Sequence, residues 1–209
     1  MIFEKHLELA GKHALLAPSQ PHWLQYDEEK LFERYVSRYA TDIGTILHSL
    51  AETLIKHRLK LKKSDKLTVM VHLLENGIPR NIIDIDRIYE NFMNYVNDAV
   101  GFRLTPEQIL YYSEYCFGTA DTISFRDNFL RIHDYKSGTV KPKIEQLLVY
   151  AALFCLEYKV KPGTLAGCEL RIYWNDQVLI HNPEADEILP IMDVIIRHDK
   201  YLKRMNEEV

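Results

Sequence analysis

The sequence predicts an α/β protein, with a central mixed β-sheet flanked by helices and a helical N-terminal region. Three observations lead to this prediction. Amphipathic helical patterns fill the N-terminal half, a β-hairpin pattern follows at residues 119–136, and a helical segment then separates this hairpin from a further pair of strands. Strands that alternate with a helix in this way favour a mixed sheet covered by helices.

Length and composition indicate one domain over residues 1–209, and an apolar fraction of 47% supports a sizeable core. We expect a helical N-terminal part at about 1–105, a sheet-containing core at about 106–181 and a C-terminal helix at about 184–208. The net charge of −4 argues against a general nucleic-acid-coating protein. DNA binding would therefore need a local basic groove.

The three cysteines lack the paired spacing of a metal site, and we expect reduced core thiols at Cys116, Cys155 and Cys168. No iron–sulfur cluster is expected, because such clusters use four cysteine ligands. No apolar run reaches membrane-spanning length, and the N-terminus lacks a signal-peptide pattern. We therefore expect a cytoplasmic protein without a membrane partner.

Helical patterns account for the N-terminal part. Ser19 is a candidate N-cap, and two amphipathic helices are predicted over residues 28–39 and 41–59. The second of these carries Gly44 and, one turn later, His48. By itself a helix histidine is more often a core or surface residue than a ligand, so His48 needs support from elsewhere in the chain.

Two further helices are predicted over residues 67–75 and 84–100, separated by a break at Gly77. Their apolar and aromatic stripes are typical of core packing. A strongly basic run lies before them at residues 56–66. It has two interpretations that the sequence leaves open, a solvated helix end or a track for a phosphate backbone.

The predicted hairpin consists of strands at residues 119–125 and Phe129–Lys136, joined by a polar turn at residues 126–128. A preceding strand is predicted at residues 111–117. A break follows the hairpin, because Ser137-Gly138 interrupts the strand pattern.

The hairpin carries the residues that suggest chemistry. Side chains alternate along a strand, so Asp134 and Lys136 point the same way, and Asp121 on the partner strand is placed to reach that face. Two carboxylates and a lysine form a site suited to a hard divalent cation, which can activate water and stabilise charge on a phosphate. Lys136 would orient that water or neutralise developing negative charge.

A helix is predicted over residues 144–158, and it places Gln146 and Tyr150 on one face because they are four residues apart. This pair has an ordinary interpretation as part of an amphipathic helix and a functional one as part of the site. Strands at residues 165–174 and Gln177–His181 follow, joined by a tight turn at Asn175-Asp176.

The ordered motifs resemble those of the PD-(D/E)XK nuclease superfamily. They are Gly118-Thr119-Ala120-Asp121, Asp134-Tyr135-Lys136 and the Gln146 to Tyr150 helix segment. The RecB-like branch, with phage recombination exonucleases and CRISPR-associated RecB-like nucleases, is the most similar. In that branch an upstream histidine follows a glycine, as His48 follows Gly44, and a glutamate precedes the first aspartate, where Glu114 fits. The resemblance covers roughly residues 15 to 175.

The resemblance implies a restriction-endonuclease-like core and a role for each motif residue. Asp121, Asp134 and the backbone oxygen of Tyr135 would bind Mg²⁺ or Mn²⁺, with His48 and Glu114 as further ligands. Lys136, Gln146 and Tyr150 would act in catalysis together with Asp121 and Asp134.

The implied function is a metal-dependent DNA exonuclease in phage-type recombination or DNA processing. Its substrates would be linear duplex ends or single strands, and its partners a single-strand annealing protein or further copies of the chain in a ring. Two alternatives remain open: a structure-specific endonuclease with the same chemistry, and a catalytically silent DNA- or partner-binding protein.

Overall fold

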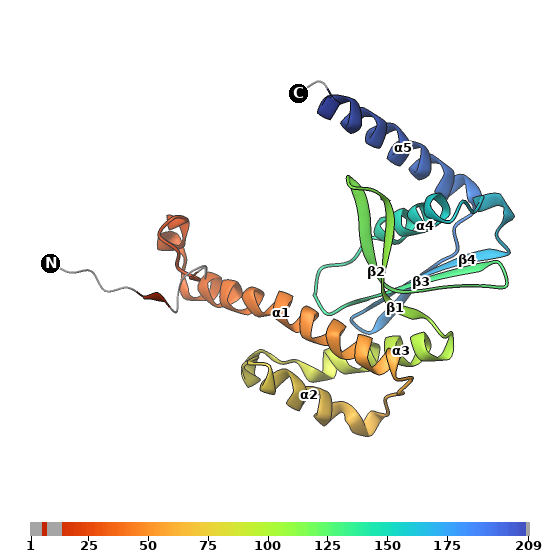
Figure 1. Cartoon of the computed structure of the whole chain (residues 1–209). Coiled ribbons are helices and arrows are strands. Elements are labelled where there is room, and N and C mark those ends of the chain that lie inside the picture. The colour runs from red at the N-terminus through yellow and green to blue at the C-terminus, as the bar shows by residue number, and fades with distance from the viewer. Residues whose placement is uncertain (1–5, 8–13, 208–209) are drawn as a thin grey trace.

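The computed structural model describes residues 6–7 and 14–207. It is an α/β structure with a five-stranded mixed sheet, flanked by helices and preceded by a helical region, as predicted (Figure 1). The main elements are α1 (Glu28–Lys56), α2 (Lys66–Glu75), α3 (Ile85–Gly101), β1 (Thr105–Ser113), β2 (Cys116–Arg126), β3 (Phe129–Lys136), α4 (Glu145–Glu157), β4 (Gly167–Trp174), β5 (Gln177–His181) and α5 (Ala185–Glu207).

The N-terminal region differs from the prediction in one respect, because one long helix replaces the two predicted over residues 28–59. Helix α1 begins after Asp27, whose side chain accepts the backbone N–H of Lys30 at 2.8 Å, and it continues to Lys56. The residues at the expected break are Ala40 and Thr41, and neither interrupts a helix as glycine or proline would. The predicted cap at Ser19 is also wrong, since the short 3₁₀ helix there begins after Gln20 without a side-chain cap.

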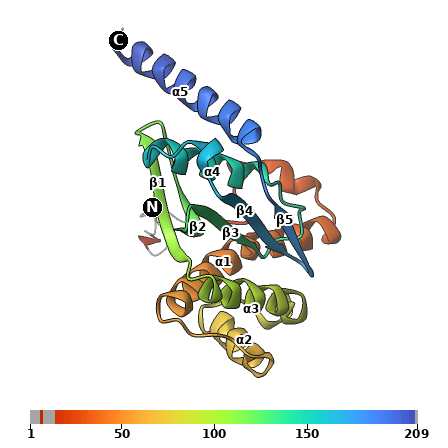
Figure 2. The same ribbon diagram turned by 90° about the vertical axis from the view of Figure 1, so that its right-hand side faces the viewer.

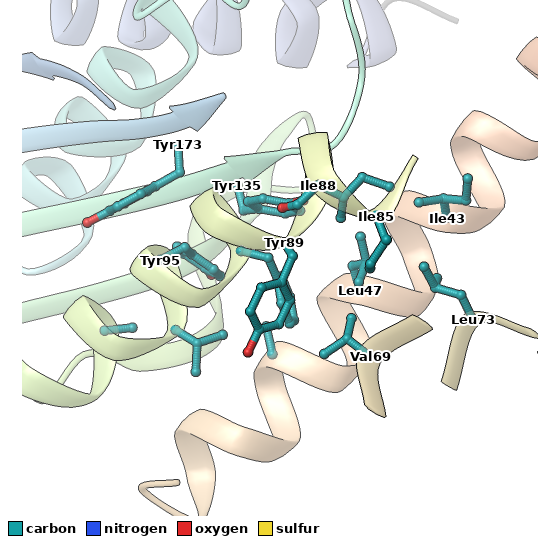
Figure 3. Packing of buried hydrophobic residues seen from close by; sticks show 14 of the residues in the cluster. Ile43, Leu47, Val69, Leu73, Ile85, Ile88, Tyr89, Tyr95, Tyr135 and Tyr173 are labelled. Atoms are coloured by element: carbon teal, nitrogen blue, oxygen red, sulfur yellow. The ribbon is translucent and has the colours of Figure 1, made fainter. Parts of the chain in front are cut away.

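Helices α1, α2 and α3 pack together and cover one face of the sheet. Figure 3 shows Leu47 of α1 and Leu73 of α2 in this core, with Tyr95 of α3 beside Tyr135 and Tyr173 of the sheet. The rings of Tyr95 and Tyr135 stack with their centroids 5.8 Å apart. This packing fixes the position of α1 relative to β3, because both contribute to the same core.

The sheet has the order β1-β2-β3-β4-β5, with β3 and β4 parallel and the other neighbours antiparallel. The turn between β2 and β3 is formed by Asp127 and Asn128, which have φ angles of 51° and 59°. Two consecutive left-handed residues make the tight turn that suits the twist of a hairpin. The hairpin is therefore confirmed.

Strand β1 begins earlier than predicted. It runs from Thr105 to Ser113, and Glu114 and Tyr115 form the turn into β2. The expected strand at residues 111–117 is wrong, because it crosses this turn. Pro106 at the start of β1 is tolerated since β1 is an edge strand and has neighbours on one side.

Helix α4 covers the opposite face of the sheet and packs against α5 (Figures 1 and 2). Its Leu147 and Ala151 are fully buried with Leu130 and Ile132 of β3. The two faces of the sheet thus have separate cores, one with α1–α3 and one with α4 and α5. Among the helices within the described residues, none is long and apolar enough to cross a membrane.

Strand β2 pairs with β3 over only part of its length, because its first residues, at the hairpin with β1, have no partner in β3. The ladder between β2 and β3 ends at the pair Thr122 and His133, whereas β2 stays paired with β1 as far as Cys116. Figure 1 shows the β1–β2 hairpin turning away from β3 beyond this point. We call the opening between Asp121 of β2 and Asp134 of β3 the fork.

Candidate active site

The fork brings the two predicted aspartates together. Asp121 is the first residue of β2 beyond the ladder, and its Oδ2 accepts the backbone N–H of Tyr135 at 3.1 Å. A side-chain oxygen of Asp121 thus accepts the hydrogen bond of a β3 backbone N–H at the point where the backbone ladder between β2 and β3 has ended. This hydrogen bond fixes the Asp121 carboxylate beside the β3 segment that carries Asp134.

Asp134 and Lys136 point the same way, as strand alternation predicts. Lys136 Nζ donates to Asp134 Oδ1 at 2.9 Å. The Asp134 residue is only 2% exposed, and its second oxygen, Oδ2, has no hydrogen-bond partner among the residues that the structure describes. A buried carboxylate oxygen without a partner is costly, so it indicates a missing ligand or a proton.

His48 reaches the same place from α1. The buried residues Leu47 and Ala51 set the rotation of the helix, so His48 and Glu52 face the fork. His48 Nδ1 lies 3.4 Å from Asp121 Oδ2. Burial lowers the pKa of His48, while the charge of Asp134 and a hydrogen bond to the Tyr135 backbone oppose this effect. The imidazole at neutral pH is therefore a neutral group that can offer a lone pair.

Glu107 is a site residue that the sequence pattern did not identify. Ligand atoms of His48, Glu107 and Asp121 all lie within 4.8 Å of one another. Glu107 has a left-handed φ of 50°, and it lies across from Asp121 because its neighbours Pro106 and Gln108 pair with the residues on either side of Asp121. Strained non-glycine backbone of this kind is concentrated at functional sites.

Glu114, the glutamate that was expected here, lies elsewhere. It is in the turn between β1 and β2, next to Tyr115, whose hydroxyl accepts a hydrogen bond from Asn206 of α5. Along the strand it is seven residues from Asp121, or roughly 20 Å of extended chain. The structure therefore does not bring Glu114 to the fork, and Glu107 takes that place.

Burial and mutual repulsion control the electrostatics of the two aspartates. Burial raises the pKa of Asp121 to about 6, against a hydrogen bond from the Tyr135 backbone. Burial and the charge of Asp121 raise the pKa of Asp134 to about 7, against the attraction of Lys136. A cation between the two carboxylates would remove this repulsion and replace their protons.

Gln146 and Tyr150 approach the fork from α4. Burial raises the pKa of Tyr150, as do the charges of Asp121 and Asp134, whereas a hydrogen bond with Gln146 lowers it. The Tyr150 ring lies over Gly118, where an added Cβ would be 3.1 Å from Tyr150 Cε1. The glycine of the Gly118 to Asp121 motif therefore leaves room for this ring.

Two hollows border the site, and α1 contributes to the lining of both. The first, the acidic hollow, has a volume of about 500 Å³ and is lined by His48 with Glu52, Glu107 and Asp121. The second, the large groove, has a volume of about 890 Å³ and includes Lys136 and Gln146 in its lining. Asp121 and Glu107 thus line one hollow, and Lys136 lines the other.

The donor set fits a hard divalent cation. Carboxylate oxygens are the ligands that Mg²⁺ and Mn²⁺ prefer, and a neutral imidazole is compatible with Mn²⁺. Oδ2 of Asp134, which no described residue contacts by a hydrogen bond, and the Asp121 carboxylate supply such oxygen ligands. The cysteines lie apart from each other along the chain, with Cys155 and Cys168 buried in the α4 core and Cys116 at the start of β2.

The model of one protein family matches residues 13–158, which is more than half of the chain. The family is DUF2800, described as a protein of unknown function. The chain belongs to this DUF2800 family. The matched region contains α1 to α4 and so includes His48, Glu107 and every residue of the fork. Among curated proteins, none matches the sequence.

Proposed function

We propose that this DUF2800 protein is a divalent-metal-dependent DNA nuclease that hydrolyses phosphodiester bonds. The single observation that carries the proposal is the buried Asp134 carboxylate beside Asp121, in which Lys136 donates to one oxygen and no described residue donates to the other. Two buried acids that repel each other destabilise a fold unless a ligand neutralises them. A cation is the simplest such ligand.

Asp121 and Asp134 would hold the cation, together with the backbone oxygen of Tyr135. His48 and Glu107 border the same space from α1 and β1 and would complete or orient the ligand set. When bound, Mg²⁺ or Mn²⁺ supplies positive charge against the phosphate and promotes ionisation of water.

The protein side chains around this position would do the remaining work. Lys136, held beside Asp134, neutralises negative charge that develops on the phosphate oxygens. Tyr150 has a raised pKa and so remains protonated at neutral pH, which makes its hydroxyl a hydrogen-bond donor. Gln146 bonds to Tyr150 and fixes the orientation of that hydroxyl toward the phosphate.

The resemblance to RecB-like PD-(D/E)XK nucleases supports an exonuclease that acts on linear DNA in the cytoplasm, within phage-type recombination or DNA processing. In that setting the partners would be a single-strand annealing protein and further copies of the chain.

The proposal is tested by digestion of end-labelled linear DNA, both duplex and single-stranded, with Mg²⁺ or Mn²⁺ and with EDTA. We expect metal-dependent release of short products, and a loss on the order of 100-fold or more for Asp134→Asn. Lys200→Ala is the matched control, because Lys200 is exposed on α5. Equal cleavage by Asp134→Asn and the parent contradicts the proposal.

The mode of cleavage is tested in the same assay with covalently closed circular DNA. An exonuclease needs an end and leaves the circle intact, whereas an endonuclease nicks it. Binding of DNA without metal-dependent cleavage would instead support the silent binding protein.

A further inference from the structure

The large groove lies between the N-terminal half of α1 and residues 137–144. Phe32, Val36 and Ala40 of α1 line one side, and Val140 and Pro142 line the other. Phe32 is 56% exposed and Val140 is 84% exposed. An exposed apolar cleft of this volume has the size of a small-ligand site and indicates something that covers it.

The groove leads directly to the candidate active site. Lys136 and Gln146 line it as well, so its inner end lies at the fork. Its second wall is fixed to the fold, because Arg87 of α3 donates to the Ser137 carbonyl at 2.9 Å and Trp174 of β4 donates from Nε1 to the Gly138 carbonyl at 2.9 Å. The groove is therefore a built extension of the site.

The charges that line the two hollows differ in sign. The large groove is bordered by four basic side chains, Arg87, Lys136, Lys141 and Lys143, and by two acidic ones, Glu33 and Glu145. The acidic hollow is bordered by carboxylates and by His48. Without a bound cation, a polyanionic strand is attracted to the large groove and repelled from the acidic hollow.

The apolar walls select the form of the DNA. A phenyl ring and aliphatic side chains on two facing walls suit the flat face of a nucleobase, which stacks on such surfaces regardless of its identity. In a duplex, each base face is covered by its neighbours, and the bases present only their edges. Only an unpaired nucleotide can place its base against Phe32.

We propose that the large groove binds an unpaired nucleotide of the DNA strand that lies across the fork, so that the substrate is a single strand or a frayed end. This inference rests on the proposed nuclease function. Phe32 and Val36 would contact the base from α1, Val140 from the opposite wall, and Lys141 and Lys143 the phosphates at the rim.

Binding is measured by fluorescence anisotropy in EDTA, so that the result does not depend on cleavage. The probes are a labelled single strand of roughly 12 nucleotides and a blunt hairpin duplex with the same stem sequence. We expect the full chain to bind the single strand at least about tenfold more tightly. Equal affinity for the two probes overturns the proposal.

Two pairs of α1 variants locate the binding. Phe32→Ala removes the stacking surface, and Leu31→Ala is its control, because Leu31 is exposed on the same helix but does not line the groove. Ser37→Trp fills the groove, and Thr53→Trp is its control. Ser37 and Thr53 are both exposed on α1, each donates its hydroxyl to a carbonyl of its own helix, and Thr53 lies outside both hollows.

We expect Phe32→Ala and Ser37→Trp each to raise the Kd for the single strand roughly five- to a hundredfold, with both controls within about twofold of the parent. If both groove variants keep the parent's Kd, the groove does not bind the strand. Failure of the nuclease proposal is distinguishable, since it would leave this pattern of binding intact while the parent fails to cleave DNA in Mg²⁺ or Mn²⁺.

Discussion

The carboxylate of Asp121 accepts the backbone N–H of Tyr135 at 3.1 Å, just beyond the last pair of the β2–β3 ladder. One side chain thus closes the end of a ladder and faces the position proposed for a cation. These two tasks are separable by substitution, because an amide oxygen can accept the N–H but lacks the negative charge.

Asp121→Asn should therefore fold normally and lose cleavage on the order of 100-fold or more. Asp121→Ala should lose the same activity and also be less stable than Asp121→Asn, by about 1–3 kcal/mol, because the Tyr135 amide is left without its partner. Urea unfolding of both variants in EDTA measures this difference. Equal stability of the two variants would show that the hydrogen bond does not hold the fork.

Glu107 and Glu114 provide a direct test of which glutamate belongs to the site. Glu107→Gln should weaken Mn²⁺ binding and cleavage by about tenfold or more, because Glu107 shares a ligand cluster with His48 and Asp121. Glu114→Gln should change neither, since Glu114 lies in the β1–β2 turn. Calorimetric titration with Mn²⁺ measures the affinities, and the opposite ranking of the two variants would contradict the assignment.

The two motif glycines should respond differently to alanine. An added Cβ at Gly118 would lie 3.1 Å from Tyr150 Cε1, so Gly118→Ala must displace the Tyr150 ring and should lower cleavage by about tenfold. An added Cβ at Gly44 would meet Ser137 Oγ at 3.5 Å, an ordinary contact. Gly44→Ala should keep its activity and raise stability by about 0.5–1 kcal/mol, because glycine weakens a helix interior.

Lys136→Gln should lower cleavage by about 10²- to 10³-fold, because it removes the ammonium group that pairs with Asp134 and would neutralise charge on the phosphate. It should also raise the pKa of Asp134 further, since the charge of Lys136 opposes the effect of burial. The pH at which Mn²⁺ begins to bind should therefore move upward. An unchanged pH profile of Mn²⁺ binding would separate Lys136 from Asp134.

Without metal, the protein should lose stability as the pH rises from about 4 to 7. Burial raises the pKa of the Asp134 carboxyl from its ordinary value of 3.8 to about 7 in the folded state, so the folded state holds the proton more tightly than the unfolded chain does. The favourable contribution is complete below the unfolded value and disappears as the pH passes the folded one. We expect a loss of about 2–4 kcal/mol.

Asp134→Asn should remove the part of this pH dependence that comes from Asp134, leave the smaller part that comes from Asp121, and be more stable than the parent at pH 8 in EDTA. Urea unfolding at pH 5 and pH 8, with and without Mn²⁺, measures both effects. If the parent shows the same stability at both pH values in EDTA, the Asp134 carboxyl is not destabilised by burial.

Local patterns predicted the parts of the fold whose signals are contained in short segments. The hairpin followed from the polar turn at Asp127 and Asn128, and the α4 helix from the helix-forming residues that come after the break at Ser137-Gly138. The same rules failed where a choice depended on distant contacts. Helix α1 passes its expected break because its second half, which α3 and the sheet bury from Ile43 to Ile55, extends through Ala40 and Thr41 without a glycine or proline to stop it.

The site shows the same limit. Strand alternation was sufficient to place Asp134 beside Lys136. The choice between Glu107 and Glu114 required the register of β1 against β2, which a one-residue shift would reverse. The left-handed Glu107 and the edge proline Pro106 both obscure the strand period at that point. Placing β1 at residues 105–113 would have revealed Glu107 opposite Asp121.

The two cores on opposite faces of the sheet each supply part of the fork. His48 belongs to a helix held by the first core, and Tyr150 to a helix held by the second. A destabilising change deep in either core, for example at Leu47 or Leu147, should therefore abolish cleavage under conditions in which the chain is still folded. Cleavage activity thus depends on how the helices of the two cores are aligned across the sheet.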